Sequence, residues 1–145
     1  MNESLLPVGS CRVGAAFPDR AAAIRACGRL LVESGNVDEP YVEAMVERDA
    51  ASTVYVGNGV AVPHGTKAST AHIRRTGLAV VQVPDGVDFG KDRVARLLVA
   101  VAALGDEHMD LLAEIAELCA DDDALARLLA AKSPAELHAL LTAGA

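Results

Sequence analysis

Two uninterrupted apolar stretches in the second half of the chain have the length of buried β-strands. One runs from Gly77 to Val83 and the other from Val94 to Ala103. Strands that are buried on both faces show such continuous runs, whereas half-exposed strands alternate. The turn predicted at Pro84-Asp85-Gly86 allows the two to pair antiparallel at the centre of a sheet. Shorter strands are predicted at 10–17, 53–56, 60–62 and 87–89, and a second turn is predicted at Gly90 to Asp92.

Helical periodicity covers most of the remaining chain. Apolar residues at helical spacing predict a helix from Pro18 to Ser34, which Gly35-Asn36 would end in a left-handed conformation. A second helix is predicted from Asp38 to Arg48 or Asp49. The last third predicts three more: 107–120 with Asp106 as N-cap, 124–131 after three aspartates, and a capping box at Ser133-Pro134-Ala135-Glu136 that opens a helix to Leu141.

This order of elements predicts an α/β fold, a mixed β-sheet flanked by α-helices on both faces in a single domain. Residues 10–145 would form the domain, residues 1–9 a flexible leader, and residues 66–76 a polar loop or one helical turn. A chain of 145 residues that is 52% hydrophobic suits one core of this kind.

Composition excludes several function classes. A net charge of -7, with two Tyr, two Phe and no Trp, argues against a nucleic-acid surface. No apolar run approaches the ~20 residues of a membrane helix, and the N-terminus lacks a secretory signal, so we expect a cytoplasmic protein. The three cysteines are widely spaced and odd in number, which favours reduced core thiols over a disulfide framework or a zinc site: Cys11, Cys27 and Cys119.

The strongest candidate for chemistry is His64, within the segment from Gly57 to Thr66. A glycine loop and a short strand precede it, Pro63 fixes the backbone before it, and Gly65 leaves room beside it for a second molecule. A histidine at a strand end in this setting suits a nucleophile. The alternative is an ordinary turn with a structural histidine.

Two further residues suit the binding of a phosphoryl group. His108 is about the second residue of a predicted helix, where free backbone N–H groups and the helix dipole favour an anion. Arg48 ends the helix that leads to the glycine loop, and its planar fork fits phosphate oxygens. The alternatives are an exposed first-turn histidine and an arginine that only pairs with the helix dipole. His72 and His138 are predicted to be peripheral.

Three segments resemble the mannitol/fructose-type enzyme IIA domains of the bacterial phosphoenolpyruvate-dependent sugar phosphotransferase system. They are residues 41–48, residues 57–66, and Gly105-Asp106-Glu107-His108 with the leucines that follow. Within the family, residues 83–90 and the Gly105–His108 segment look most like the mannitol-specific branch. The resemblance implies that His64 is phosphorylated and that His108 and Arg48 line its pocket. It also implies a phosphate-pocket loop of Gly57, Asn58, Gly59, Gly65 and Thr66, with no cofactor and no metal.

The resemblance further implies two phosphoryl transfers. His64 would accept the group from a histidine phosphocarrier protein and pass it to a cysteine of an enzyme IIB component, expected on another chain with the membrane permease. The outer ring nitrogen would react while an acceptor anchors the inner one. We also expect Val60 and Val62 to contribute to an apolar docking patch.

Three alternatives stay open at this point. One is a regulatory, nitrogen-related enzyme IIA that controls partners through its phosphorylation state. The others are a non-catalytic binding domain and a metal hydrolase built on His64 and His108, although no His-x-x-x-His or paired-cysteine spacing supports a zinc site.

Overall fold

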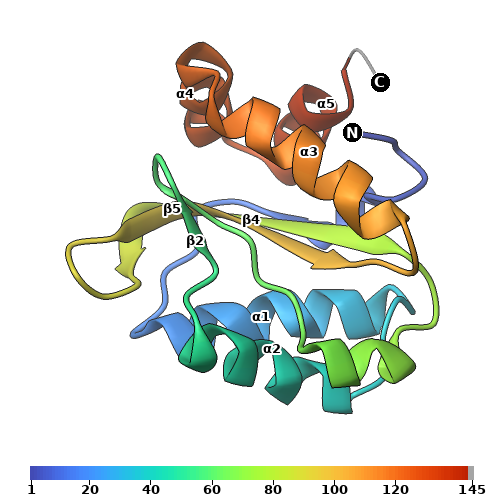
Figure 1. The fold of residues 1–145 in the computed structure, drawn as a ribbon. Coiled ribbons are helices and arrows are strands. Elements are labelled where there is room, and N and C mark those ends of the chain that lie inside the picture. Colours follow the sequence, from blue (N-terminus) through green and yellow to red (C-terminus); the bar gives the residue numbers. More distant parts are fainter. Residues whose placement is uncertain (144–145) are drawn as a thin grey trace.

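A five-stranded mixed sheet separates two layers of helices in the computed structural model, which describes residues 1–143 (Figure 1). Helices α1 and α2 cover one face of the sheet, and α3, α4 and α5 cover the other, with the N-terminus on the side of α3–α5. The predicted fold class is therefore confirmed. The elements are η1 (Val8–Ser10), β1 (Cys11–Arg12), α1 (Arg20–Glu33), α2 (Pro40–Ala51), β2 (Tyr55–Gly57), β3 (Val60–Ala61), η2 (Lys67–His72), β4 (Gly77–Asp88), β5 (Val94–Ala102), α3 (Glu107–Cys119), α4 (Asp122–Ala130) and α5 (Pro134–Thr142).

The strand order is β1-β4-β5-β3-β2, with the two long strands next to each other as predicted. β4 and β5 pair antiparallel, with Val80 opposite Val99, while β1 runs parallel to β4 and β3 runs parallel to β5. The short β2 and β3 form an antiparallel hairpin at one edge. β3 therefore leads the chain from the edge hairpin into the sheet just before His64.

Alternate residues of the central strands β4 and β5 belong to two separate hydrophobic cores, one on each face of the sheet. Val81 and Leu98 pack with α1 and α2, whereas Val80 and Val99 pack with α3–α5, and all four side chains are fully buried. Side chains of a strand point alternately to opposite faces, so a strand covered on both sides needs apolar residues at every position. This explains the continuous apolar runs.

The N-terminal residues are packed, which corrects the expectation of a flexible leader. Leu6 is fully buried, and the carbonyl of Leu5 accepts a hydrogen bond from the Leu78 N–H at 2.8 Å. The carbonyl of Leu6 lies 2.8 Å from Nε2 of His138, which gives that histidine a structural partner. The segment thus completes the core on the α3–α5 side of the sheet.

Several predicted boundaries also differ. β4 continues through Pro84-Asp85-Gly86 as an irregular stretch with a register shift, and the reversal lies at 89–93, where Lys91 and Asp92 have positive φ. The first strand is two residues long instead of spanning 10–17. Asp106 makes no capping hydrogen bond, whereas Asp121 and Ser133 do. Within residues 1–143, no helix is both long and apolar enough to span a bilayer.

Candidate active site

His64 follows β3 at the point where the chain leaves the sheet. The Val62 N–H donates to Val54 O and the Val101 N–H donates to Pro63 O, both at 2.9 Å, so pairing to neighbouring strands continues almost to the histidine. Nδ1 of the ring lies 2.8 Å from the carbonyl oxygen of Val62. Because a carbonyl only accepts, Nδ1 carries the proton in the neutral ring, and Nε2 keeps its lone pair.

The structure brings the three predicted site residues into one pocket of about 430 Å³. The rings of His64 and His108 lie 5.6 Å apart between centroids and are tilted by 60°. Arg48, Lys67 and Thr66 also line the pocket, and its lining within residues 1–143 includes no carboxylate. Two fixed cations, two histidines and a hydroxyl suit an anion with several oxygens.

Burial and neighbouring charges favour a neutral His64. Partial burial lowers the pKa of His64 from its ordinary 6.5, and the positive charges of Arg48 and His108 lower it further against the opposing hydrogen bond to Val62. A ring that resists protonation keeps the Nε2 lone pair available at neutral pH. The site therefore combines an anchored imidazole that has a free Nε2 lone pair with cationic groups that suit an anion.

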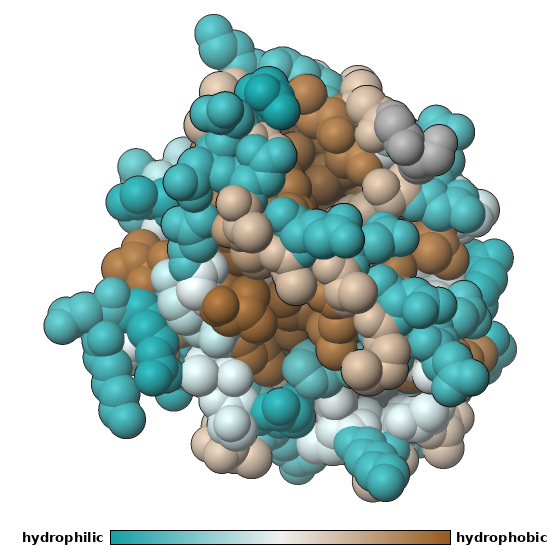
Figure 2. Space-filling model, turned by 45° about the horizontal axis from the view of Figure 1, so that its top comes forward, coloured by the Kyte–Doolittle hydropathy of each residue, from teal (hydrophilic) through white to brown (hydrophobic). Residues whose placement is uncertain are grey.

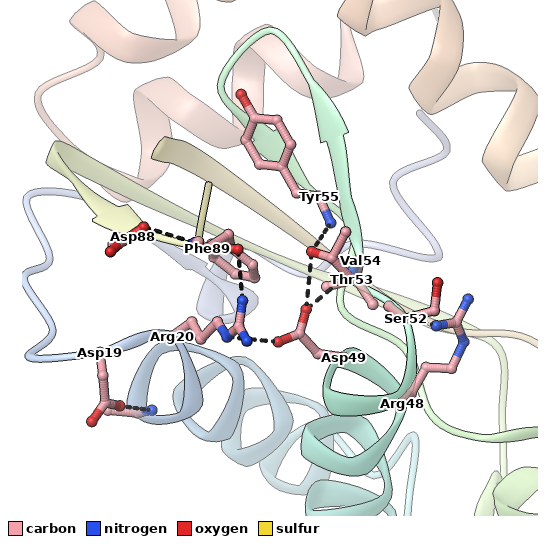
Figure 3. A network of polar contacts seen from close by, with 12 residues as sticks. Asp19, Arg20, Arg48, Asp49, Ser52, Thr53, Val54, Tyr55, Asp88 and Phe89 are labelled. Carbon is pink, nitrogen blue, oxygen red and sulfur yellow. Dashed lines mark hydrogen bonds and ion pairs between the residues drawn. The ribbon is translucent and has the colours of Figure 1, made fainter. Parts of the chain in front are cut away.

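Arg48 reaches the pocket from the last turn of α2. Its Nη1 donates a hydrogen bond to the carbonyl oxygen of Ser52 at 2.5 Å, and the Ser52 N–H donates to the Arg48 carbonyl at 3.1 Å (Figure 3). The guanidinium is thereby tied to the end of its own helix, where carbonyls also favour a positive charge.

Tyr41, which the sequence did not mark as a site residue, holds the backbone beside His64. The buried hydroxyl of Tyr41 accepts from the Gly65 N–H at 2.9 Å and donates to the Val101 carbonyl at 3.1 Å. A Cβ on Gly65 would lie 2.3 Å from Oγ of Ser69 and 2.5 Å from the Tyr41 ring, so this position requires glycine. A tyrosine on the apolar face of a predicted helix was the available signal, because a buried hydroxyl needs a partner.

The helix that carries His108 starts at a position set by Thr76. The Thr76 hydroxyl donates to a carboxylate oxygen of Glu107 and accepts from the Leu104 N–H, both at 3.0 Å. Glu107 is the first residue of α3, so these contacts fix the turn on which His108 lies. The predicted cap, Asp106, makes no capping hydrogen bond.

The glycine loop has a different role from the predicted one. Gly57, Asn58 and Gly59 form the β2–β3 hairpin turn and do not line the His64 pocket. Asn58, with φ of 54°, donates from its side-chain amide to the Cys119 carbonyl at 2.8 Å and to the Asp122 carboxylate at 3.0 Å. The loop therefore tethers the hairpin to the junction of α3 and α4. Of the predicted loop, Gly65 and Thr66 remain at the pocket.

The prediction that Val60 and Val62 contribute to an exposed apolar patch is wrong. Val60 and Val62 are 1% and 2% exposed and belong to the core. Two exposed large apolar residues, Leu104 and Met109, lie next in sequence to the pocket residues Gly105 and His108.

A larger groove of about 710 Å³ lies on the other side of α3, among the N-terminal residues, α4 and α5. Leucines 118, 128, 140 and 141 and the carboxylates of Glu114 and Glu117 line it. Figure 2 shows this side of the molecule, where apolar surface lies in hollows between hydrophilic side chains. Glu3, Asp121 and Arg127 also line the groove, and its excess of carboxylates suits a phosphate group less well than the lining of the His64 pocket does.

The chain belongs to the family described as "Phosphoenolpyruvate-dependent sugar phosphotransferase system, EIIA 2", whose model matches residues 4–144. It is therefore a phosphotransferase component, and the resemblance drawn from its motifs is confirmed. The mannitol-specific phosphotransferase enzyme IIA component of Enterococcus faecalis is 43% identical over 124 residues, which cover 83% of this chain and 86% of the relative.

Solved structures agree with this assignment. The crystal structure of IIA mannitol from Escherichia coli matches with a TM-score of 0.84 and 33% identity, covering 92% of this chain and 96% of that chain. A solution structure of the complex of enzyme IIAMtl and phosphorylated enzyme IIBMtl from Escherichia coli matches with a TM-score of 0.85 and 32% identity, covering 92% and 94%. The fold and the family are thus established independently of the site geometry.

Proposed function

We propose that this chain is a phosphocarrier that takes a phosphoryl group on Nε2 of His64 from a histidine phosphocarrier protein and passes it to a cysteine of an enzyme IIB component. The observation that carries the proposal is the 2.8 Å contact between Nδ1 of His64 and the Val62 carbonyl. It assigns the proton to Nδ1, so the nitrogen that remains nucleophilic is Nε2, in a pocket that holds Arg48 and His108.

In the first transfer, the Nε2 lone pair attacks phosphorus in line with the phosphorus–nitrogen bond of the donor's phosphohistidine. That bond breaks, and its electron pair returns to the donor ring. The proton on Nδ1 of His64 stays in place, since the hydrogen bond to Val62 stabilises the positive charge that develops on the ring. Arg48 and His108 would contact the equatorial oxygens, where positioning and charge stabilisation supply most of the catalysis.

In the second transfer, a thiolate of the IIB component attacks phosphorus and the bond to Nε2 breaks, which regenerates the neutral ring. The cysteines of this chain do not suit this role. Burial raises the pKa of Cys11 to about 11 and that of Cys27 to about 12, and it also raises the pKa of Cys119, so all three favour the thiol form. The lowered pKa of His64 favours both transfers, because a neutral imidazole is the nucleophile in the first transfer and the leaving group in the second.

The named relatives point to mannitol or a related hexitol as the sugar whose uptake this carrier serves. The Enterococcus faecalis relative is called mannitol-specific, and the Escherichia coli domain was solved with its phosphorylated IIB partner. We place the reaction in the cytoplasm, where phosphoenolpyruvate supplies the phosphoryl group.

The test is phosphorylation in the presence of phosphoenolpyruvate, enzyme I and the histidine phosphocarrier protein, followed by intact mass at neutral or alkaline pH. The native chain should gain one phosphoryl group, and His64→Ala should gain none. His72→Ala is the matched control, since His72 lies on η2 outside the pocket lining and should be labelled like the native chain. Absence of label on the native chain would refute the proposal.

The acceptor is tested by adding purified IIB components to the labelled chain. Transfer to a mannitol-type IIB in preference to a fructose-type IIB supports the assigned sugar class. A labelled chain that no IIB component discharges would instead support the regulatory role.

A further inference from the structure

The position of the Arg48 guanidinium depends on Ser52. Arg48 and Ser52 are joined twice, by the Nη1 contact to the Ser52 carbonyl at 2.5 Å and by the backbone bond from Ser52 N–H to the Arg48 carbonyl at 3.1 Å. Ser52 follows the last residue of α2 and has an extended backbone. The contacts that fix the short segment between α2 and β2 therefore also fix the position of the Arg48 guanidinium relative to His64.

Asp49 holds the connection from inside the protein. Its Oδ1 accepts hydrogen bonds from the Val54 N–H at 3.0 Å and from the Thr53 hydroxyl at 3.3 Å (Figure 3). Asp49 is 5% exposed. Because the carboxylate links residue 49 to residues 53 and 54, Ser52 lies within a closed turn between two anchored points.

Arg20 holds Asp49 in turn. Its Nε lies 3.2 Å from Oδ2 of Asp49, and its Nη1 donates to the Phe89 carbonyl at the end of β4, at 2.6 Å (Figure 3). Arg20 is the first residue of α1, and the Asp19 carboxylate accepts from the Ala22 N–H to cap that helix. A continuous chain of polar contacts thus runs from β4 through α1 to the end of α2.

The ion pair between Arg20, whose side chain is 40% exposed, and the buried Asp49 is not needed merely to join the two helices. Exposed ion pairs, Arg25 with Glu43 and Arg29 with Glu39, already connect α1 to α2. Burying a carboxylate is costly, and apolar replacements of buried ion pairs are often neutral or stabilising. Every contact of the Asp49 carboxylate is made with this turn or with Arg20. This arrangement indicates that the carboxylate positions the Arg48 side chain, which is bound to the turn.

We propose that Arg20 and Asp49 are positioning residues that hold the Ser52 turn so that Arg48 meets the phosphoryl group on His64. This inference rests on the proposed function. Neither residue lines the His64 pocket, so both act only through Arg48. Loss of the pair would leave His64 and His108 in place and would release the guanidinium.

The test compares Asp49→Asn and Arg20→Gln with Glu43→Gln, which breaks an exposed ion pair between the same two helices. Asp49→Asn keeps a side-chain oxygen for the Val54 N–H, so the variant retains a route to the folded state. Both network variants should slow phosphoryl transfer to His64 by on the order of tenfold, because small misplacements of a positioning group carry large rate penalties. Glu43→Gln should transfer at the native rate.

Two readouts separate positioning from a general structural effect. Nuclear magnetic resonance titration of His64 in Asp49→Asn should show a higher pKa, since the Arg48 charge has moved away; loss of the Asp49 negative charge alone would lower it. His108 and Lys67 also face the ring but are unchanged in this variant. In an Arg48→Ala background, Asp49→Asn should cause no further loss of transfer rate.

An equal loss of rate in both backgrounds, or an unchanged His64 pKa with native transfer, would overturn the proposal. A native chain that takes no label would refute the proposed function instead. In that case the titration still decides whether Asp49 positions Arg48, because it needs no phosphoryl donor.

Discussion

Replacing Tyr41 with phenylalanine removes one oxygen atom that two backbone groups share. The hydroxyl accepts from the Gly65 N–H at 2.9 Å and donates to the Val101 carbonyl at 3.1 Å. Burial raises the pKa of the Tyr41 hydroxyl, so it remains a donor across the physiological range. The ring itself stays in the variant, and the core keeps its packing.

The magnitude follows from the groups left without a partner. An unsatisfied buried polar group costs about 1–3 kcal/mol, and the Gly65 side is near the pocket, where water can replace part of the loss. We therefore expect a decrease in the free energy of unfolding of about 2–3 kcal/mol. For a domain of this size this is a fall in Tm of roughly 6–10 °C.

Tyr55 provides a matched control. Its hydroxyl also accepts from a glycine N–H, that of Gly59 at 2.9 Å, but in the hairpin away from the pocket. Tyr55→Phe loses one partly exposed hydrogen bond and should cost about 1 kcal/mol. Only Tyr41→Phe loosens the backbone next to His64, and it should slow phosphoryl transfer by on the order of tenfold.

Urea unfolding and the initial rate of phosphohistidine formation, followed by intact mass at neutral pH, measure the two effects. Native stability of Tyr41→Phe would show that the hydroxyl does not satisfy these groups. An equal fall in rate for Tyr41→Phe and Tyr55→Phe would show that the effect on transfer reflects stability and not the backbone at Gly65.

Four further outcomes are expected. Because the pKa of His64 lies below its ordinary 6.5, the pH at which the labelling rate falls to half of its plateau should lie below 6.5; a midpoint at or above 6.5 contradicts this. Gly65→Ala should cost about 1–3 kcal/mol and slow labelling, whereas Gly9→Ala, with open space around its Cβ, should do neither. Lys67→Ala should lower the labelling rate by roughly two- to fivefold, less at high salt; an equal effect at all salt concentrations would exclude a charge contribution. Asn58→Ala should reduce stability by about 1–2 kcal/mol in urea unfolding with native labelling, and impaired labelling would restore a role in the site.

The amino-acid sequence by itself determined the layers of the fold. Continuous apolar runs at 77–83 and 94–103 require strands covered on both faces, and helical periodicity before and after them supplies the covering helices. It also determined the reactive candidate. A strand that ends in Pro63-His64-Gly65 is a local arrangement, and its motif identifies the family without reference to the rest of the structure.

Tertiary structure decided which of the candidate groups meet. The glycine loop and His64 are close in the sequence, yet a strand separates them, so Asn58 reaches α4 while His64 reaches Arg48 and His108. Tyr41 and Val62 hold the backbone and the ring at the site, but the sequence predicted only a helical position for Tyr41 and a docking patch for Val62. The physical reason is that periodicity reports which side of an element is buried, whereas hydrogen-bond partners depend on what the packing of distant elements places within about 3 Å.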